Sequence, residues 1–162
     1  MGMPLIKALG LTRYLEGPIT VILALIGPGN TPSIARALAC RVTDQNKQVF
    51  IDGQDKAMLD PPPLPGSSVA IVTCLPSTLQ TYQFKGTFQH LRPATAAEAD
   101  WITGPIERMV IEFDKVGYLE EKSRAYLAVN PLDLAVLSFE LTAVFEQTPG
   151  PNAGVRLYGQ PK

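Results

Sequence analysis

Short β-branched and apolar runs follow one another along this chain, and turn-forming residues rather than helices separate the first of them. The run "PITVILALIG" (18–27) ends in "GPGN", and "SIARALACRVT" (33–43) and "KQVFID" (47–52) follow with only "DQN" between them. Such runs favour strands, and turns this short join antiparallel neighbours. Residues 18–52 are therefore predicted to form an antiparallel meander.

A proline tract then interrupts the chain. The stretch "LDPPPLPG" (59–66) holds three consecutive prolines, which cannot lie in a helix interior or a central strand. Three more strand-like runs follow it: "SSVAIVTCL" (67–75), "LQTYQFKGTFQHL" (79–91) and, near the end, "LAVLSFELTAVFEQ" (134–147). The tract therefore separates two groups of strands.

Helical spacing dominates only one long region, predicted as a helical insertion over about 95–128. Thr95 and Glu98 make a capping-box pattern at its start. The pair Gly104-Pro105 predicts an interruption, giving two short helices or a kink. A short helix is also predicted at about 4–15. Five or six strands with one helical insertion favour a small barrel over a parallel α/β sheet. The predicted fold is therefore mainly β, in a single domain spanning 1–162.

Composition excludes several classes of function. A net charge of −1 and a sequence pI of about 5.8 leave no basic excess for a nucleic acid backbone. The longest apolar stretch, 19–26, is too short to span a bilayer, and the first residues do not resemble a signal peptide. The only cysteines, Cys40 and Cys74, form no CxxC motif, so reduced thiols and a cytoplasmic location are expected.

The usual catalytic constellations are missing from the sequence. His90 is the only histidine, which argues against Ser-His-Asp triads, Cys-His pairs and multi-histidine metal sites. No dinucleotide-binding glycine motif or P-loop occurs, and "GPGN" is interpreted as a hairpin turn. The carboxylates at 120–121 and at 52 and 55 are interpreted as solvated. No catalytic residue is assigned, and an enzyme with these residues would depend on a cofactor.

Three basic residues stand within strand-like runs. Arg36 and Arg41 lie among small and apolar residues, and Lys85 shares one face of its predicted strand with Thr81 and Gln83. One interpretation is that each charge points to solvent. The other is an anion site, because arginine, glutamine and threonine suit the phosphate and ring edge of flavin mononucleotide (FMN). The residues alone leave both open.

Three segments resemble a known family. They are the closing loop "FEQTPGPNAG" (145–154), the strand "PSIARALACRV" (32–42) and the strand "TYQFKG" (81–86). Over about 15–157 the chain resembles the pyridoxamine 5′-phosphate oxidase-like proteins of the FMN-binding split-barrel superfamily. The likeness is greatest to a branch whose members end in a Gln-Thr-Pro-Gly-Pro loop followed by Ala-Gly.

This resemblance implies a split β-barrel of about six antiparallel strands that forms a homodimer with FMN between the subunits. It assigns cofactor contacts to Arg36, Ala37, Arg41, Lys56, Thr81, Gln83, Lys85, Gln147, Thr148 and Pro149. The implied function is a flavin-dependent oxidoreductase acting on a small molecule, with no nucleic acid or membrane partner. The alternative is a non-enzymatic dimeric module that binds a flavin or another small ligand.

Two further expectations concern the closing loop and the segment that in the oxidases holds the flavin phosphate. The loop 147–162 is rich in proline and glycine, so it is expected to be rigid and to wall the cleft between subunits, or else to serve dimer packing alone. In 50–66, where the oxidases hold the flavin phosphate, Lys56 is the only cation. The tryptophan, arginine and histidine of the oxidases' substrate motif are also absent, so vitamin B6 oxidation is not expected.

Overall fold

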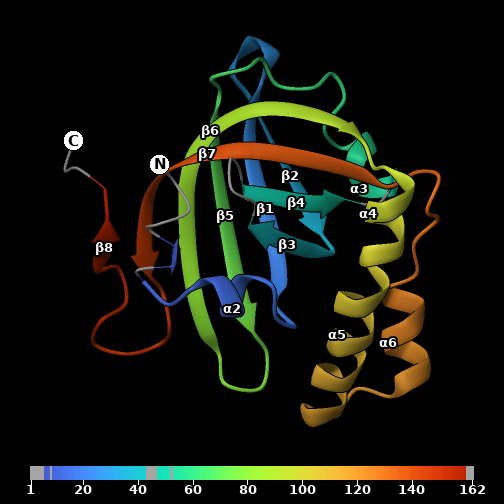
Figure 1. Cartoon of the computed structure of the whole chain (residues 1–162). Coiled ribbons are helices and arrows are strands. Elements are labelled where there is room, and N and C mark those ends of the chain that lie inside the picture. The colour runs from blue at the N-terminus through green and yellow to red at the C-terminus, as the bar shows by residue number, and fades with distance from the viewer. Residues whose placement is uncertain (1–5, 8, 43–46, 52, 160–162) are drawn as a thin grey trace.

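The computed structural model describes residues 6–7, 9–42, 47–51 and 53–159. Within these residues one strongly curled antiparallel sheet is covered by helices on one side (Figure 1). Its strands follow the order β2-β1-β5-β6-β7-β4-β3, and β8 pairs with β7. The predicted fold class, a mainly β split barrel with helical insertions, is therefore confirmed.

The described residues contain eight strands, more than the six expected. The strands are β1 (Thr20–Gly27), β2 (Thr31–Ala37), β3 (Ala39–Val42), β4 (Lys47–Ile51), β5 (Ser68–Leu75), β6 (Gln80–Pro93), β7 (Ala135–Glu146) and β8 (Arg156–Tyr158). The helices are α2 (Thr12–Leu15), the 3₁₀ turn η1 (Pro28–Asn30), α3 (Gly53–Ala57), α4 (Ala96–Trp101), α5 (Thr103–Lys115) and α6 (Glu120–Tyr126).

The predicted meander over 18–52 is wrong. The hairpins β1–β2 and β3–β4 lie at opposite ends of the strand order, because β1 continues to β5 and β4 to β7. The run predicted as one strand over 33–43 breaks at Leu38, whose N–H donates to the Phe50 carbonyl at 2.7 Å. The break lets the chain cross from one end of the curled sheet to the other, which draws the barrel together. The predicted turn at 44–46 lies outside the described residues.

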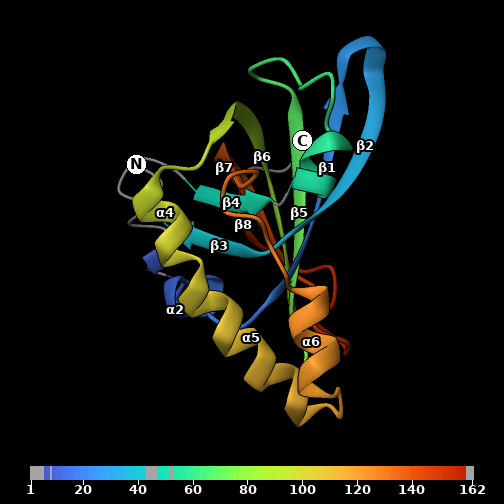
Figure 2. The same ribbon diagram turned by 90° about the vertical axis from the view of Figure 1, so that its right-hand side faces the viewer.

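Two apolar clusters hold the fold together. Inward-facing side chains such as Val21, Leu23 and Phe84 fill the barrel, and alternate residues of the same strands face outward. A second cluster outside the barrel, including Phe50 and Ile102, packs α4 and α5 against the sheet. In Figure 2, α4, α5 and α6 lie together on one side of the barrel.

The helical insertion is interrupted at Ile102, two residues before the break predicted at Gly104-Pro105. Thr95 caps α4 in a full capping box with Glu98, as expected. Helix α4 ends at Trp101, and α5 begins at Thr103, so Pro105 lies in the first turn of α5. Proline is tolerated there because a first-turn N–H has no partner within the helix.

Both chain ends are described in part. In the stretch predicted as a helix over 4–15, α2 spans Thr12–Leu15, while residues 1–5 and 8 lie outside the described residues. In the stretch predicted as a loop over 147–162, β8 adds a short strand beside β7, and residues 160–162 lie outside the described part. The segment 147–155 is thus a connection between two strands of the sheet.

Candidate ligand-binding site

A row of side chains crosses the outer face of five neighbouring strands and β8. Each residue of this row lies directly opposite the next in the strand register. In order along the row they are Arg36, Ile22, Val72, Gln83, Phe145 and Arg156. Directly paired residues point to the same face, so these six form one line, here called the outer row. At about 4.8 Å per strand it spans roughly 24 Å, with a basic residue at each end.

A groove of about 800 Å³ lies at the β8 end of this row. We call it the β6–β8 groove; it is lined by Lys85, Glu140, Leu141, Thr142, Ala143, Phe145, Arg156, Tyr158 and Gly159. Its volume falls within the range of small-molecule sites. In Figure 1, β8 lies on the opposite side of the barrel from α4, α5 and α6.

Two cations share one aromatic ring in this groove. The Lys85 Nζ lies 4.9 Å and the Arg156 Cζ 5.2 Å from the centre of the Phe145 ring. Within the part of the chain that the structure describes, neither cation forms an ion pair. Positive charge without a carboxylate partner, beside a flat ring, is suited to a planar anion.

The closing loop is fixed to the start of β6. The Thr81 N–H donates to Thr148 Oγ1 at 3.0 Å, and the Gln147 N–H donates to the Thr81 carbonyl at 2.8 Å. Gly154 has φ of 89°, a region that favours glycine, and its N–H donates to the Glu146 carbonyl at 2.7 Å. These bonds turn the chain back so that β8 pairs with β7. The loop thereby sets the position of Arg156.

Gly159 closes the end of the groove beside β7. Its φ is 103°, and a Cβ on it would lie 2.6 Å from the Thr142 carbonyl oxygen. Only a glycine lets the backbone approach β7 this closely. The groove's narrow end is therefore made by backbone rather than by side chains.

The other end of the outer row carries an ion pair. The Arg36 side chain donates from Nε to Asp55 Oδ2 at 3.4 Å and from Nη1 to the Tyr126 carbonyl at 2.8 Å. Its backbone N–H donates to Asp55 Oδ1 at 2.9 Å. Lys56 is half-buried on α3 next to Asp55, and the Ala37 methyl group is buried in the barrel. These contacts tie β2 to α3 and α6, which supports the structural interpretation of Arg36.

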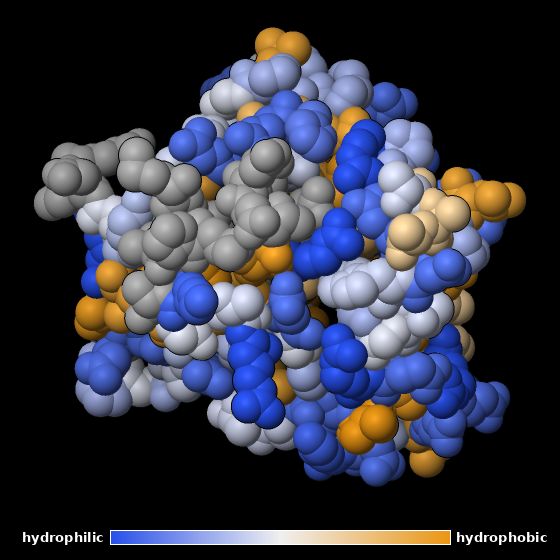
Figure 3. All heavy atoms as spheres, in the orientation of Figure 1, coloured by the Kyte–Doolittle hydropathy of each residue, from blue (hydrophilic) through white to orange (hydrophobic). Residues whose placement is uncertain are grey.

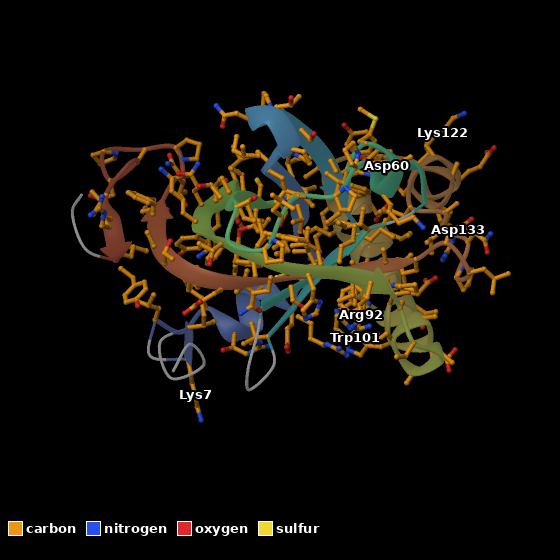
Figure 4. The ribbon with its side chains drawn as sticks, turned by 90° about the horizontal axis from the view of Figure 1, so that it is seen from above. Lys7, Asp60, Arg92, Trp101, Lys122 and Asp133 are labelled. Atoms are coloured by element: carbon orange, nitrogen blue, oxygen red, sulfur yellow. The ribbon has the colours of Figure 1, made fainter. Side chains whose placement is uncertain are left out.

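Arg41 lies in a separate cluster around Glu98. Its Nη2 donates to Glu98 Oε1 at 2.8 Å, and Arg92 binds both Glu98 oxygens at 2.8 Å. The guanidinium also lies 5.3 Å from the ring centres of Phe50 and Trp101. Figure 4 shows Arg92 and Trp101 close together beside α4. The hydrogen bonds from Arg92 lower the pKa of Glu98 to about 2, against the opposing effect of burial.

The ten residues assigned from sequence therefore divide among three places. The β6–β8 groove is the nearest site to six of them: Thr81, Gln83, Lys85, Gln147, Thr148 and Pro149. The far end of the row holds Arg36, Ala37 and Lys56. Arg41 lies beside α4. Their cofactor roles stay predictions. Sequence reasoning missed Phe145, although it opens the closing-loop motif, and Arg156, whose one available signal was a basic residue directly after the rigid loop.

Other site types find little support among the described residues. No group of three or more histidine, cysteine or acidic residues there could hold a metal ion. Cys40 is buried and Cys74 half-buried, and no disulfide joins the two. No helix in the described part is both long and apolar enough to cross a membrane. On the face in Figure 3, apolar residues form small separate patches among polar ones.

Comparison with known proteins gives only distant structural likeness. No protein-family model matches the chain, and no curated protein matches it. Among solved structures, an F420 reductase shares 16% identity, with 80% of this chain and 91% of that chain covered and a TM-score of 0.48. A pyridoxamine 5′-phosphate oxidase-related FMN-binding protein from Nostoc punctiforme shares 15%, covering 93% and 86%, with a TM-score of 0.43.

A third solved structure is HutZ, the heme storage protein from Vibrio cholerae. It shares 14% identity, with 96% of each chain covered and a TM-score of 0.43. The three names refer to different ligands. At this level of similarity no neighbour's ligand is carried to this chain, and the split-barrel assignment depends on the strand order described above.

Proposed function

We propose that this chain is a flavin-binding split-barrel protein that holds FMN at the β6–β8 groove and acts as a small-molecule oxidoreductase. The observation that carries this proposal is the pair Lys85 and Arg156, two cations beside the Phe145 ring that form no ion pair within the described residues. The resemblance of three sequence segments to FMN-binding split-barrel proteins supports the choice of ligand.

The residues of the groove fit FMN in kind. A phosphate takes the forked donors of an arginine and the point charge of a lysine, and Arg156 and Lys85 provide both. The Phe145 ring offers an apolar face to a flat heterocycle, and the hydroxyl groups of Thr142 and Tyr158 suit a polyhydroxyl chain. The carboxylate of Glu140 also lines the groove, and it would repel the phosphate from its own side. The anionic group is therefore assigned to the Lys85 and Arg156 side.

When bound, FMN would supply the hydride or electron transfer, and the chain's own residues would position it. Lys85 and Arg156 would anchor the anionic group, and the closing loop would keep Arg156 in place through its bonds to Thr81. We assign no proton-transferring side chain.

We further propose that the working form is a homodimer built on the outer row. Its middle residues Ile22 and Val72 are 45% and 38% exposed, although both are large and apolar. In a twofold interface centred between Val72 and Gln83, the midpoint of the row, the row of one subunit runs antiparallel to that of its partner. The Arg36 end of one chain then lies against the Phe145 and Arg156 end of the other, so one site draws on both.

Titration of FMN into the purified chain, followed by flavin fluorescence, tests the site. Lys85→Gln and Arg156→Gln should each weaken binding by about ten- to a hundredfold, because a charge-assisted contact contributes about 1.5–3 kcal/mol. Lys7→Gln, which removes an exposed charge that points away from the barrel in Figure 4, should bind like the parent. No saturable FMN binding, or equal affinity in all variants, would show that the groove is not a flavin site.

The alternative is a non-enzymatic module with the same groove. Among the described lining residues, Lys85, Glu140 and Tyr158 could transfer a proton, but Lys85 is assigned to the anionic group and neither of the others is assigned a catalytic role. FMN binding at Lys85 and Arg156 without oxidation of any nicotinamide donor would select this alternative.

A further inference from the structure

A second recess lies between β1 and the hairpin formed by α5 and α6, far from the β6–β8 groove (Figures 1 and 2). Its volume is about 480 Å³, and it is lined by Thr20, Phe113, Tyr118, Lys122, Ser123 and Tyr126. None of these residues belongs to the proposed flavin site. We call it the aromatic recess.

Three rings shape this recess. The centres of Phe113 and Tyr118 lie 5.4 Å apart, and those of Phe113 and Tyr126 lie 6.0 Å apart at an interplanar angle of 62°. Tyr118 and Tyr126 are 59% and 52% exposed, whereas Phe113 is half-buried. The rings thus form a cup with Phe113 at its base and the two tyrosines at its rim. Exposed ring faces arranged in this way suit a flat apolar ligand.

The cup is held in place by contacts outside it. After the turn at Gly117, the Tyr118 N–H donates to the Phe113 carbonyl at 3.0 Å. Arg36 lies over the Tyr126 ring, 4.3 Å from its centre, and donates to the Tyr126 carbonyl.

A second arginine holds the two helices of the hairpin together. Arg124 on α6 binds both oxygens of Glu107 on α5, at 2.7 and 3.0 Å. Because this pair is exposed it contributes little, and the rim is held mainly by the backbone bond of Tyr118 and the contacts of Arg36 with Tyr126.

The charge of the recess decides the ligand class. A cup of three aromatic rings is in general suited to a cation. Here, however, Lys122 is the only charged residue, and no residue is a carboxylate, among the described residues that line the recess. The ammonium group would repel a cation and attract an anion. Figure 4 shows Lys122 directed outward from α6, and the residue also lines the recess.

We propose that the aromatic recess is a second binding site, for a small planar aromatic ligand that carries one acidic group. The aromatic ring of the ligand lies in the cup between Tyr118 and Tyr126. Its acidic group contacts the ammonium group of Lys122 at the mouth. Among the described residues it shares no lining residue with the β6–β8 groove, and its link to the proposed dimer site is Arg36, which lies over the Tyr126 ring.

Three matched probes test the proposal on the whole chain: 2-naphthoate, its neutral amide and 2-naphthylmethylammonium, titrated by calorimetry. Naphthoate should bind most tightly and the ammonium compound least. Lys122→Gln should weaken naphthoate by about three- to tenfold and leave the amide unchanged, because only the charged contact is lost. Tyr118→Ala should weaken both, and the charge control Lys7→Gln neither.

Several outcomes would overturn the proposal. One is tightest binding of the ammonium probe, and another is equal loss in Lys122→Gln and Lys7→Gln. A third is naphthoate binding that disappears in Lys85→Gln or Arg156→Gln and persists in Lys122→Gln, since the probe would then occupy the β6–β8 groove. Absence of saturable binding by any probe would likewise exclude the site.

Discussion

Arg36 and Arg41 show what a single residue's chemistry does and does not predict. Both are cations in apolar strand sequence, and the residues alone left open whether each faces solvent or forms an anion site. Arg36 pairs with Asp55, 19 positions away, and Arg41 with Glu98, 57 positions away. Partners so distant depend on the tertiary fold. The capping box of Thr95 and Glu98 was predictable because its residues are three apart, but the recruitment of Glu98 by two arginines was not.

Glu98 gives the chain a pH-dependent stability. Its folded pKa of about 2 lies below the ordinary value of a carboxyl group, because the charged form is hydrogen-bonded by Arg92. This stabilisation is complete above about pH 4.3, the pKa of an unfolded glutamate, and is lost as the pH falls toward 2. In urea titrations the Glu98→Gln variant should be about 2 kcal/mol less stable than the parent at pH 7, with the difference shrinking below pH 4.

The exposed pair of Glu107 and Arg124 provides the control for this prediction. Glu107 is 56% exposed, so Glu107→Gln should leave stability at pH 7 within experimental error of the parent. A Glu98→Gln variant whose stability runs parallel to that of the parent from pH 7 to pH 2 would mean that Glu98 does not stabilise the fold through its charge.

At the level of elements, strand identity was predictable and strand pairing was not. Alternation marked most strands correctly, but nothing in 33–43 signalled the break at Leu38, where apolar residues run on through the crossing. The short strand β8 was expected to be loop, because three residues after a glycine-rich turn carry no periodic pattern. Its position decides the groove, since β8 supplies Arg156 and Tyr158.

The closing loop is expected to contribute to ligand binding through its attachment to β6. Thr148→Val keeps the shape of the side chain but removes the acceptor for the Thr81 N–H. Stability should fall by about 1 kcal/mol, the usual contribution of one hydrogen bond. The free energy of FMN binding should be reduced by more than this loss of folding stability, because a looser loop must be ordered on every binding event.

The proline content of the loop offers a comparison. Pro149 and Pro151 are exposed, so replacing both with alanine should cost about 0.4–1 kcal/mol each through the unfolded state. FMN affinity is measured for both loop variants at concentrations where each is fully dimeric. If neither variant binds FMN more weakly than the parent there, the loop serves dimer packing alone, the alternative raised by the sequence.

The whole molecule presents an outer face that a monomer does not explain. The sequence predicted alternation, and hence an outward set of side chains, but the register that aligns Ile22, Val72 and Gln83 into one row comes only from strand pairing. Ile34, on the adjacent row, is 63% exposed. The apolar part of the row meets its own copy under a twofold rotation, and an anionic ligand between the two basic ends would offset their repulsion; this is the physical basis of the proposed dimer.

The dimer and its shared site can be tested together. The parent should have about twice the 17.5 kDa mass of one chain in light scattering at micromolar concentration, and Ile22→Glu should reduce it to one chain without unfolding, because that side chain lies outside the core. Ile111→Glu, at a still more exposed apolar position on α5, should remain dimeric. A parent of 17.5 kDa at every concentration would remove the dimer.

Mixing two defective variants then decides whether one site draws on both chains. Arg36→Glu and Lys85→Glu should each bind FMN poorly as homodimers, because every site lacks one cation. In a mixed dimer, one site combines both substitutions and the other combines the intact Arg36 of one chain with the intact Lys85 of the other. Subunit exchange should therefore restore tight binding at one site per mixed dimer, about half a site per dimer in an equal mixture. If exchange is complete by mass spectrometry and no tight binding returns, the site lies within a single subunit and the twofold arrangement proposed for the outer row is wrong.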